Sequence, residues 1–212
     1  MPHLIVCREY PPAPYPVGGI GTYAKHIANL LADAGERVHV ITQQWQGASS
    51  KESTFYGGKL IVHRLSLDEP VETGPNSEAE RQLLRGFSLS DCPSQTFSWQ
   101  VAQYCERLVE TEEIDVIEAQ EWEAPLYYLQ LRRAFGLGPH KQPPCLIHLH
   151  SPTRLIFQHN QWDTSLTDFL PLSRREEYSI QAADGLICPS RYLANEAERL
   201  YSLKPGAVQV IP

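Results

Sequence analysis

The sequence predicts an α/β fold in which helices cover both faces of one mostly parallel sheet. Short apolar runs such as His3–Cys7 and Cys145–His150 are typical of strands that are buried on both faces. Stretches with an apolar period of 3.6 residues separate these runs. Because the two patterns alternate along all 212 residues, we expect a doubly wound, Rossmann-like sheet.

Composition and charge fit a globular protein and disfavour some partners. The chain is 42% hydrophobic and 20% charged, and its net charge of −7 disfavours nucleic acid, which binds basic surfaces. The five cysteines form no CxxC pair, which indicates a reducing compartment. No apolar run approaches the roughly 20 residues that span a bilayer. We therefore expect a cytoplasmic protein, with peripheral contact at the inner face of a membrane left open.

The first third of the chain predicts one βαβ unit. His3–Cys7 is its first strand, and the proline-rich segment 11–16 must be extended. An amphipathic helix begins at Ile20 and ends at Gly35, a residue typical of helix C-termini. Val38–Thr42 is the second strand. The crossover should be right-handed.

The rest of the chain predicts further strands and helices, with weaker signals between residues 68 and 94. We expect a turn at Phe55–Gly58 and a short helix around Glu78–Leu84. The predicted strands are Leu60–Leu65, Asp115–Ala119, Cys145–His150, Gly185–Cys188 and Val208–Ile211. The predicted longer helices are 97–109, Pro125–Phe135, Ser165–Ala183 (capped near Ser165, Thr167 or Asp168) and Arg191–Tyr201.

A glycine-rich loop joins the first strand to the first helix. Gly18, Gly19 and Gly21 let backbone approach a ligand, and they leave the first helical N–H groups free to bind an anion. The alternative is a tight turn required only for packing. The spacing is not the GxGxxG of dinucleotide-binding enzymes.

Polar side chains follow several predicted strands at their carboxyl ends, where open α/β sheets bind ligands. The candidate cleft residues are Glu121, Trp122, His150, Ser190, Arg191 and Tyr192, with Arg8 and Glu9 as weaker candidates. The alternative role for His150 is a hydrogen bond to backbone at its strand end, and Ser190 is also a candidate N-cap. We expect no metal, because no carboxylate or cysteine completes a set with His148, His150 and His159.

Four blocks of sequence resemble one enzyme family. GGIGTYAKHIANLLADAGERVHVIT (Gly18 to Thr42), DVIEAQEW (Asp115 to Trp122), CLIHLHSP (Cys145 to Pro152) and ADGLICPSRYLANEA (Ala183 to Ala197) are similar to the retaining family-four glycosyltransferases of GT-B fold. The resemblance implies an enzyme of two Rossmann-like halves. The N-terminal half mostly holds the acceptor, and the C-terminal half mostly holds a nucleotide-diphosphate-sugar.

The resemblance also implies roles for individual residues. The loop formed by Gly18, Gly19, Ile20 and Gly21 would face the donor diphosphate and the acceptor, and His150 would contact the transferred sugar. No cofactor or obligatory metal is implied. We expect residues 1–212 to be the N-terminal domain, whose partner is a donor-binding domain outside this chain, and we expect the domain alone to be inactive.

Two other function classes remain to be weighed. One is a non-catalytic module that binds a sugar or phosphate ligand. The other, a nicotinamide-dependent oxidoreductase, is disfavoured because Val40–Gln44 ends the second strand without an acidic residue for a ribose. The sequence does not specify the sugar or the acceptor, which could be a lipid, a glycan or a small molecule.

Overall fold

The structure is a computed structural model that describes residues 1–212 except 15, 46, 69–76, 90–92 and 166–168. Eight strands form one sheet in the order β3-β4-β2-β1-β5-β6-β7-β8. Their bounds are β1 His3–Val6, β2 Val38–Gln43, β3 Lys51–Phe55, β4 Leu60–Leu65, β5 Val116–Gln120, β6 Cys145–His148, β7 Gly185–Cys188 and β8 Val208–Val210. Only the β3–β4 pair among these is antiparallel. The predicted Rossmann-like fold is confirmed.

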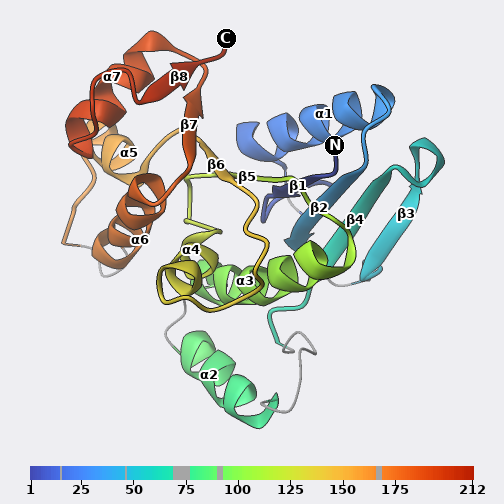
Figure 1. The fold of residues 1–212 in the computed structure, drawn as a ribbon. Helices are drawn as coiled ribbons and strands as arrows, with labels where there is room; N and C mark the ends of the chain where they lie inside the picture. Colours follow the sequence, from blue (N-terminus) through green and yellow to red (C-terminus); the bar gives the residue numbers. More distant parts are fainter. Residues whose placement is uncertain (15, 46, 69–76, 90–92, 166–168) are drawn as a thin grey trace.

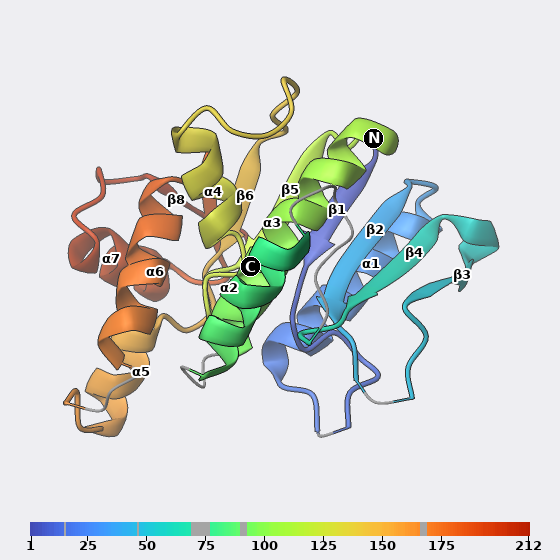
Figure 2. The same cartoon turned by 90° about the horizontal axis from the view of Figure 1, so that it is seen from below.

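Helices pack on the two faces of this sheet (Figure 1). Their bounds are α1 Gly19–Asp33, α2 Ser77–Leu89, α3 Pro93–Thr111, α4 Tyr127–Ala134, α5 Thr153–Asn160, α6 Phe169–Gln181 and α7 Arg191–Leu200. Helix α2 contacts α3, and Figure 2 shows it on the outer side of that helix. No helix in the described ranges is long and apolar enough to cross a bilayer.

Two apolar cores lie on opposite faces of the sheet. Under α1, the small side chains Ala24, Ala28 and Ala32 let the helix lie close to β1, β2 and β4. The larger core lies on the other face, where α3, α4, α6 and α7 contribute side chains such as Phe97 and Ile180. Burial of this apolar surface provides most of the folding free energy.

The structure departs from the predicted elements mainly where the sequence is polar. Strand β3 was not predicted, because the segment KESTF has little apolar character and pairs only at the sheet edge. Helix α5 was also missed, and α2 is longer than the predicted short helix. Strand β6 ends at His148, two residues before the predicted end. Helix α6 begins at Phe169, and the cap candidates Thr167 and Asp168 lie outside the described residues.

The glycine signals at both ends of α1 were informative. Gly18 is the N-cap and provides no side-chain cap, so the first N–H groups of the helix are left uncapped. After the last turn, Gly35 has a φ of +95°, a conformation that strains other L-residues. The helix therefore ends where the sequence predicts.

Candidate functional site

A pocket of about 400 Å³ lies at the carboxyl edge of the sheet. The loops that follow β1, β5 and β6 form it, together with the first turn of α1 and one residue of α5. It is lined by Glu9, Gly19, Ile20, Trp122, His150, Ser151 and Ile156. Four of these, Gly19, Ile20, Trp122 and His150, were predicted as site residues, and Glu9 was a weaker candidate.

The three glycines of the loop have different surroundings. Apart from its own helix backbone and chain neighbours, no described atom lies within 4 Å of the position that a Cβ of Gly19 would take, so this residue presents bare backbone to the pocket. A Cβ on Gly21 would lie 2.4 Å from Val17 Cγ1 and 2.5 Å from the carbonyl oxygen of Glu9. Gly21 is therefore required for packing, whereas Gly19 keeps the α1 N-terminus open.

His150 lies in a small aromatic cluster. Its ring stacks on His148 with centroids 4.2 Å apart. The ring of Tyr23 on α1 meets both edge-on, with its centroid 5.1 Å from that of His150 and 4.3 Å from that of His148. The Tyr23 hydroxyl donates a hydrogen bond of 2.9 Å to Glu118 Oε1. Burial, assisted by His148, lowers the pKa of His150 to about 4. The imidazole is therefore neutral at physiological pH.

The backbone of His150 is held by Glu121, whose carboxylate is fully buried. Glu121 Oε1 accepts hydrogen bonds from the N–H groups of His150 and Ser151 at 2.8 and 2.5 Å. Burial raises the pKa of Glu121 to about 7, although these backbone N–H groups oppose the shift. Glu121 was expected to bind acceptor hydroxyls from the cleft wall. In the structure it lies beneath the wall and orients it.

The loop that presents Trp122 has an unusual backbone. Glu123 and Ala124 have φ angles of +63° and +47°, a left-handed conformation that is unfavourable for both residue types. Such a conformation persists only where its surroundings determine it. Ala124 is fully buried, and its N–H donates to the Glu121 carbonyl at 2.8 Å.

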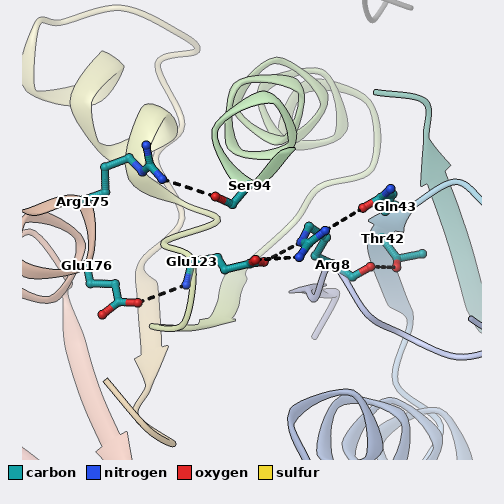
Figure 3. Close-up of polar contacts among 7 residues, drawn as sticks. All are labelled: Arg8, Thr42, Gln43, Ser94, Glu123, Arg175 and Glu176. Atoms are coloured by element: carbon teal, nitrogen blue, oxygen red, sulfur yellow. Dashed lines mark hydrogen bonds and ion pairs between the residues drawn. The ribbon is translucent and has the colours of Figure 1, made fainter. Parts of the chain in front are cut away.

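Side-chain contacts hold the same loop from two sides (Figure 3). Arg8, in the segment that follows β1, donates two hydrogen bonds of 2.5 and 2.6 Å to the Glu123 carboxylate, and a third to Gln43. From α6, Glu176 accepts the Glu123 N–H at 3.3 Å and the Thr153 hydroxyl at 2.6 Å. The loop is thus tied to two neighbouring segments, which fixes Trp122 against the pocket.

Ser190, Arg191 and Tyr192 do not join the described lining of this pocket. Ser190 is the N-cap of α7, as predicted, and accepts the Leu193 N–H at 3.2 Å. Arg191 is exposed. Tyr192 is 60% exposed, and its hydroxyl lies 3.0 Å from His159 Nε2. Tyr192 thus contacts α5, a helix that was not predicted and that contributes Ile156 to the pocket.

Some residues near the pocket had no signal in the sequence. Tyr23, within the predicted first helix, was not singled out as a site residue, and its hydroxyl was the available clue. Ser151, Ile156 and Glu176 were not singled out. Within the ranges that the structure covers, no three His, Cys, Asp or Glu side chains are arranged to hold a metal ion.

The fold and the pocket together define a class of protein. An open parallel sheet with an uncapped helix N-terminus at its carboxyl edge is the arrangement of Rossmann-like ligand-binding domains. A model of Glycosyltransferase Family 4 matches residues 17–212. The chain therefore belongs to that family. No curated protein matches it.

A solved structure supports the fold over the whole chain. It is described as sucrose-phosphate synthase from Thermosynechococcus elongatus, and it matches with a TM-score of 0.65 at 18% sequence identity. The match covers 100% of this chain and 47% of that one. This chain thus spans about half the length of the structure that it resembles. Together with the family match, this similarity supports the N-terminal GT-B domain expected from the sequence.

The two glycines that differ in surroundings give a matched test of the loop. Gly21→Ala should destabilise the protein by about 1–3 kcal/mol, because its methyl group would overlap Val17 and the Glu9 carbonyl. Gly19→Ala should change the free energy of unfolding by less than about 0.5 kcal/mol. Urea denaturation of both variants measures this difference. Equal effects would show that packing around Gly21 is not restrictive.

Burial of Glu176 predicts a pH-dependent stability. Burial raises its pKa from 4.5 to about 8, although the Thr153 hydroxyl opposes the shift. Because the folded pKa is raised, the contribution of this group is complete below the unfolded pKa and is lost as pH rises to about 8. Relative to the wild type, Glu176→Gln should therefore become more stable as pH rises over this range. Urea unfolding at several pH values checks this, and parallel curves would contradict it.

Proposed function

We propose that this chain is the acceptor-side, N-terminal domain of an enzyme that transfers a hexose from a nucleotide-diphosphate-sugar to an acceptor hydroxyl, with retention at the anomeric carbon. Membership of Glycosyltransferase Family 4 supports transfer chemistry. The single observation that carries the acceptor-side assignment is the lining of the pocket at the carboxyl edge.

The described lining of this pocket suits a polyhydroxylated ligand better than a polyanion. The Glu9 carboxylate and the Ser151 hydroxyl can hydrogen-bond the hydroxyl groups of a ligand. The neutral His150 can donate or accept one hydrogen bond, and Trp122 provides an apolar ring surface. None of the lining residues that the structure describes is a lysine or an arginine. The side chains of this wall therefore provide no positive charge for a diphosphate.

The backbone of α1 is the exception. Its first N–H groups are uncapped, and Gly19 leaves open space beside them. The partial positive charge at a helix N-terminus stabilises a phosphate group. We therefore propose that the leaving diphosphate is shared between this helix end and cationic side chains of a second, donor-binding domain.

The reaction breaks the bond between the anomeric carbon and the diphosphate oxygen and forms a bond from that carbon to the acceptor oxygen, whose proton leaves with the diphosphate. Positive charge develops on the sugar and negative charge on the leaving group. In this proposal the neutral His150 hydrogen-bonds a sugar hydroxyl and orients the ring, because a group with a pKa of about 4 is a poor proton donor at physiological pH. The Glu9 carboxylate would bind acceptor hydroxyls.

A non-catalytic module that binds a sugar or phosphate ligand is the competing interpretation. Turnover separates the two. The complete gene product should release nucleoside diphosphate from one member of a panel of nucleotide-sugars in the presence of acceptor, and NMR of the product should show the donor's anomeric configuration. Binding without turnover across the panel would favour the module, and an inverted product would exclude the retaining mechanism.

The open position of Gly19 allows a sharper test of the loop. Gly19→Asp places a carboxylate beside the α1 N-terminus, where it is compatible with the helix but repels a diphosphate. We expect at least about a 100-fold loss of kcat/KM in the complete enzyme, with an unchanged melting temperature. Gly19→Asn has the same shape without the charge and should lose clearly less. Equal losses for both variants would indicate steric exclusion and contradict the electrostatic role.

A further inference from the structure

A second pocket, of about 340 Å³, lies on the α1 side of the sheet near its β3 edge. Strands β3 and β4, the helix α1 and the segment that follows β1 surround it, and Figures 1 and 2 show these elements next to one another. Its described lining is Tyr10, Pro11, Pro12, Lys25, Asn29, Glu52, Tyr56, Leu60, Val62 and Arg64. None of these residues lines the pocket assigned to the glycosyltransferase reaction.

Arg64 is the unusual member of this set. It lies on β4 on the same face as Val62 and Leu60, which are two and four residues earlier and pack under α1. Its side chain is 0% exposed, and only its Nε has a partner, Glu52 Oε1 at 3.1 Å. Both terminal nitrogens, Nη1 and Nη2, are buried without a hydrogen-bond partner among the described residues.

Unmatched donors of this kind are costly in a folded protein. Each terminal nitrogen of a guanidinium carries two N–H groups, and a buried polar group without a partner loses its hydration without compensation. The two nitrogens form a planar fork whose geometry matches two oxygens of a phosphate or carboxylate. An anion bound in this pocket would supply the acceptors that the terminal nitrogens lack.

The other side chains indicate which anion fits. Lys25 on α1 adds a second positive charge, so that the two cations exceed the single carboxylate of Glu52. An excess of positive charge beside a guanidinium fork suits the double charge of a phosphate monoester. Tyr10 is 4% exposed and Tyr56 43% exposed, and with Asn29 they offer hydroxyl and amide partners for a polar ligand body.

We propose that this pocket binds a small organic phosphate whose phosphoryl group lies between Arg64 and Lys25. The site is separate from the proposed transferase pocket and does not depend on that function. Glu52 has a defined role in it: its hydrogen bond to Nε holds the guanidinium in place and leaves both terminal nitrogens for the phosphoryl group.

Calorimetric titration of the purified protein with glucose 6-phosphate tests the proposal. Saturable binding is expected at millimolar concentration or below, with glucose and glucuronate at least about tenfold weaker, since both lack the phosphoryl group. Inorganic phosphate should compete. Absence of saturable binding of glucose 6-phosphate, or equal binding of glucose or glucuronate, would overturn the proposal.

Variants locate the binding. Arg64→Met should abolish it, while the unliganded protein keeps or raises its melting temperature because an incompletely paired buried charge is removed. Lys25→Ala should weaken binding about tenfold. Lys204 is an exposed lysine in the turn before β8. Lys204→Ala is therefore the matched control and should bind like the wild type. If Arg64→Met does not fold, Lys25→Ala decides: wild-type affinity in that variant, or in a folded Arg64→Met, would overturn the assignment.

Discussion

The pocket at the carboxyl edge depends on one buried carboxylate. The sheet's backbone ladder reaches Leu149, whose N–H donates to Ile187, and the next two amides, those of His150 and Ser151, have left it. Buried amides at a strand end need an acceptor, and Glu121 provides it for both. In return the Glu121 N–H donates to the His148 carbonyl at 3.2 Å. The loops after β5 and β6 are thereby fixed to each other, and the pocket lies between their tips.

The loop after β5 has a strained backbone, and other contacts must offset the strain. The left-handed conformations of Glu123 and Ala124 each cost on the order of 1–3 kcal/mol. The paired hydrogen bonds from Arg8 and the contact with Glu176 hold this conformation, and both partners come from outside the loop. The consequence is a precise position for Trp122. A relaxed loop would save the strain but leave the ring free to turn away from the pocket.

The sequence was sufficient for the fold because buried parallel strands and amphipathic helices have periodicities that need no tertiary information. The glycine loop, His150 and Trp122 could be placed at one edge of the sheet for the same reason, since topology brings strand ends together. The role of Glu121 could not be predicted, because the sequence pattern of a carboxylate after a strand is the same whether the side chain faces solvent or lies under a neighbouring loop. Ile156 was missed because α5 was not predicted. The partly unpaired state of Arg64 is a property of packing alone.

The contrast between the two pockets follows from the segment that joins them. Residues 8–18 leave β1 and contribute Glu9 to one pocket and Tyr10, Pro11 and Pro12 to the other. On the side of Glu9, the described wall carries a carboxylate, a neutral histidine and an uncapped helix end, so it favours hydroxyl groups and can share a phosphate only through backbone. On the side of Tyr10, a buried guanidinium provides fixed positive charge. The sign of the side-chain charge therefore assigns a different ligand chemistry to each side of one short segment, and the fold keeps these two chemistries apart.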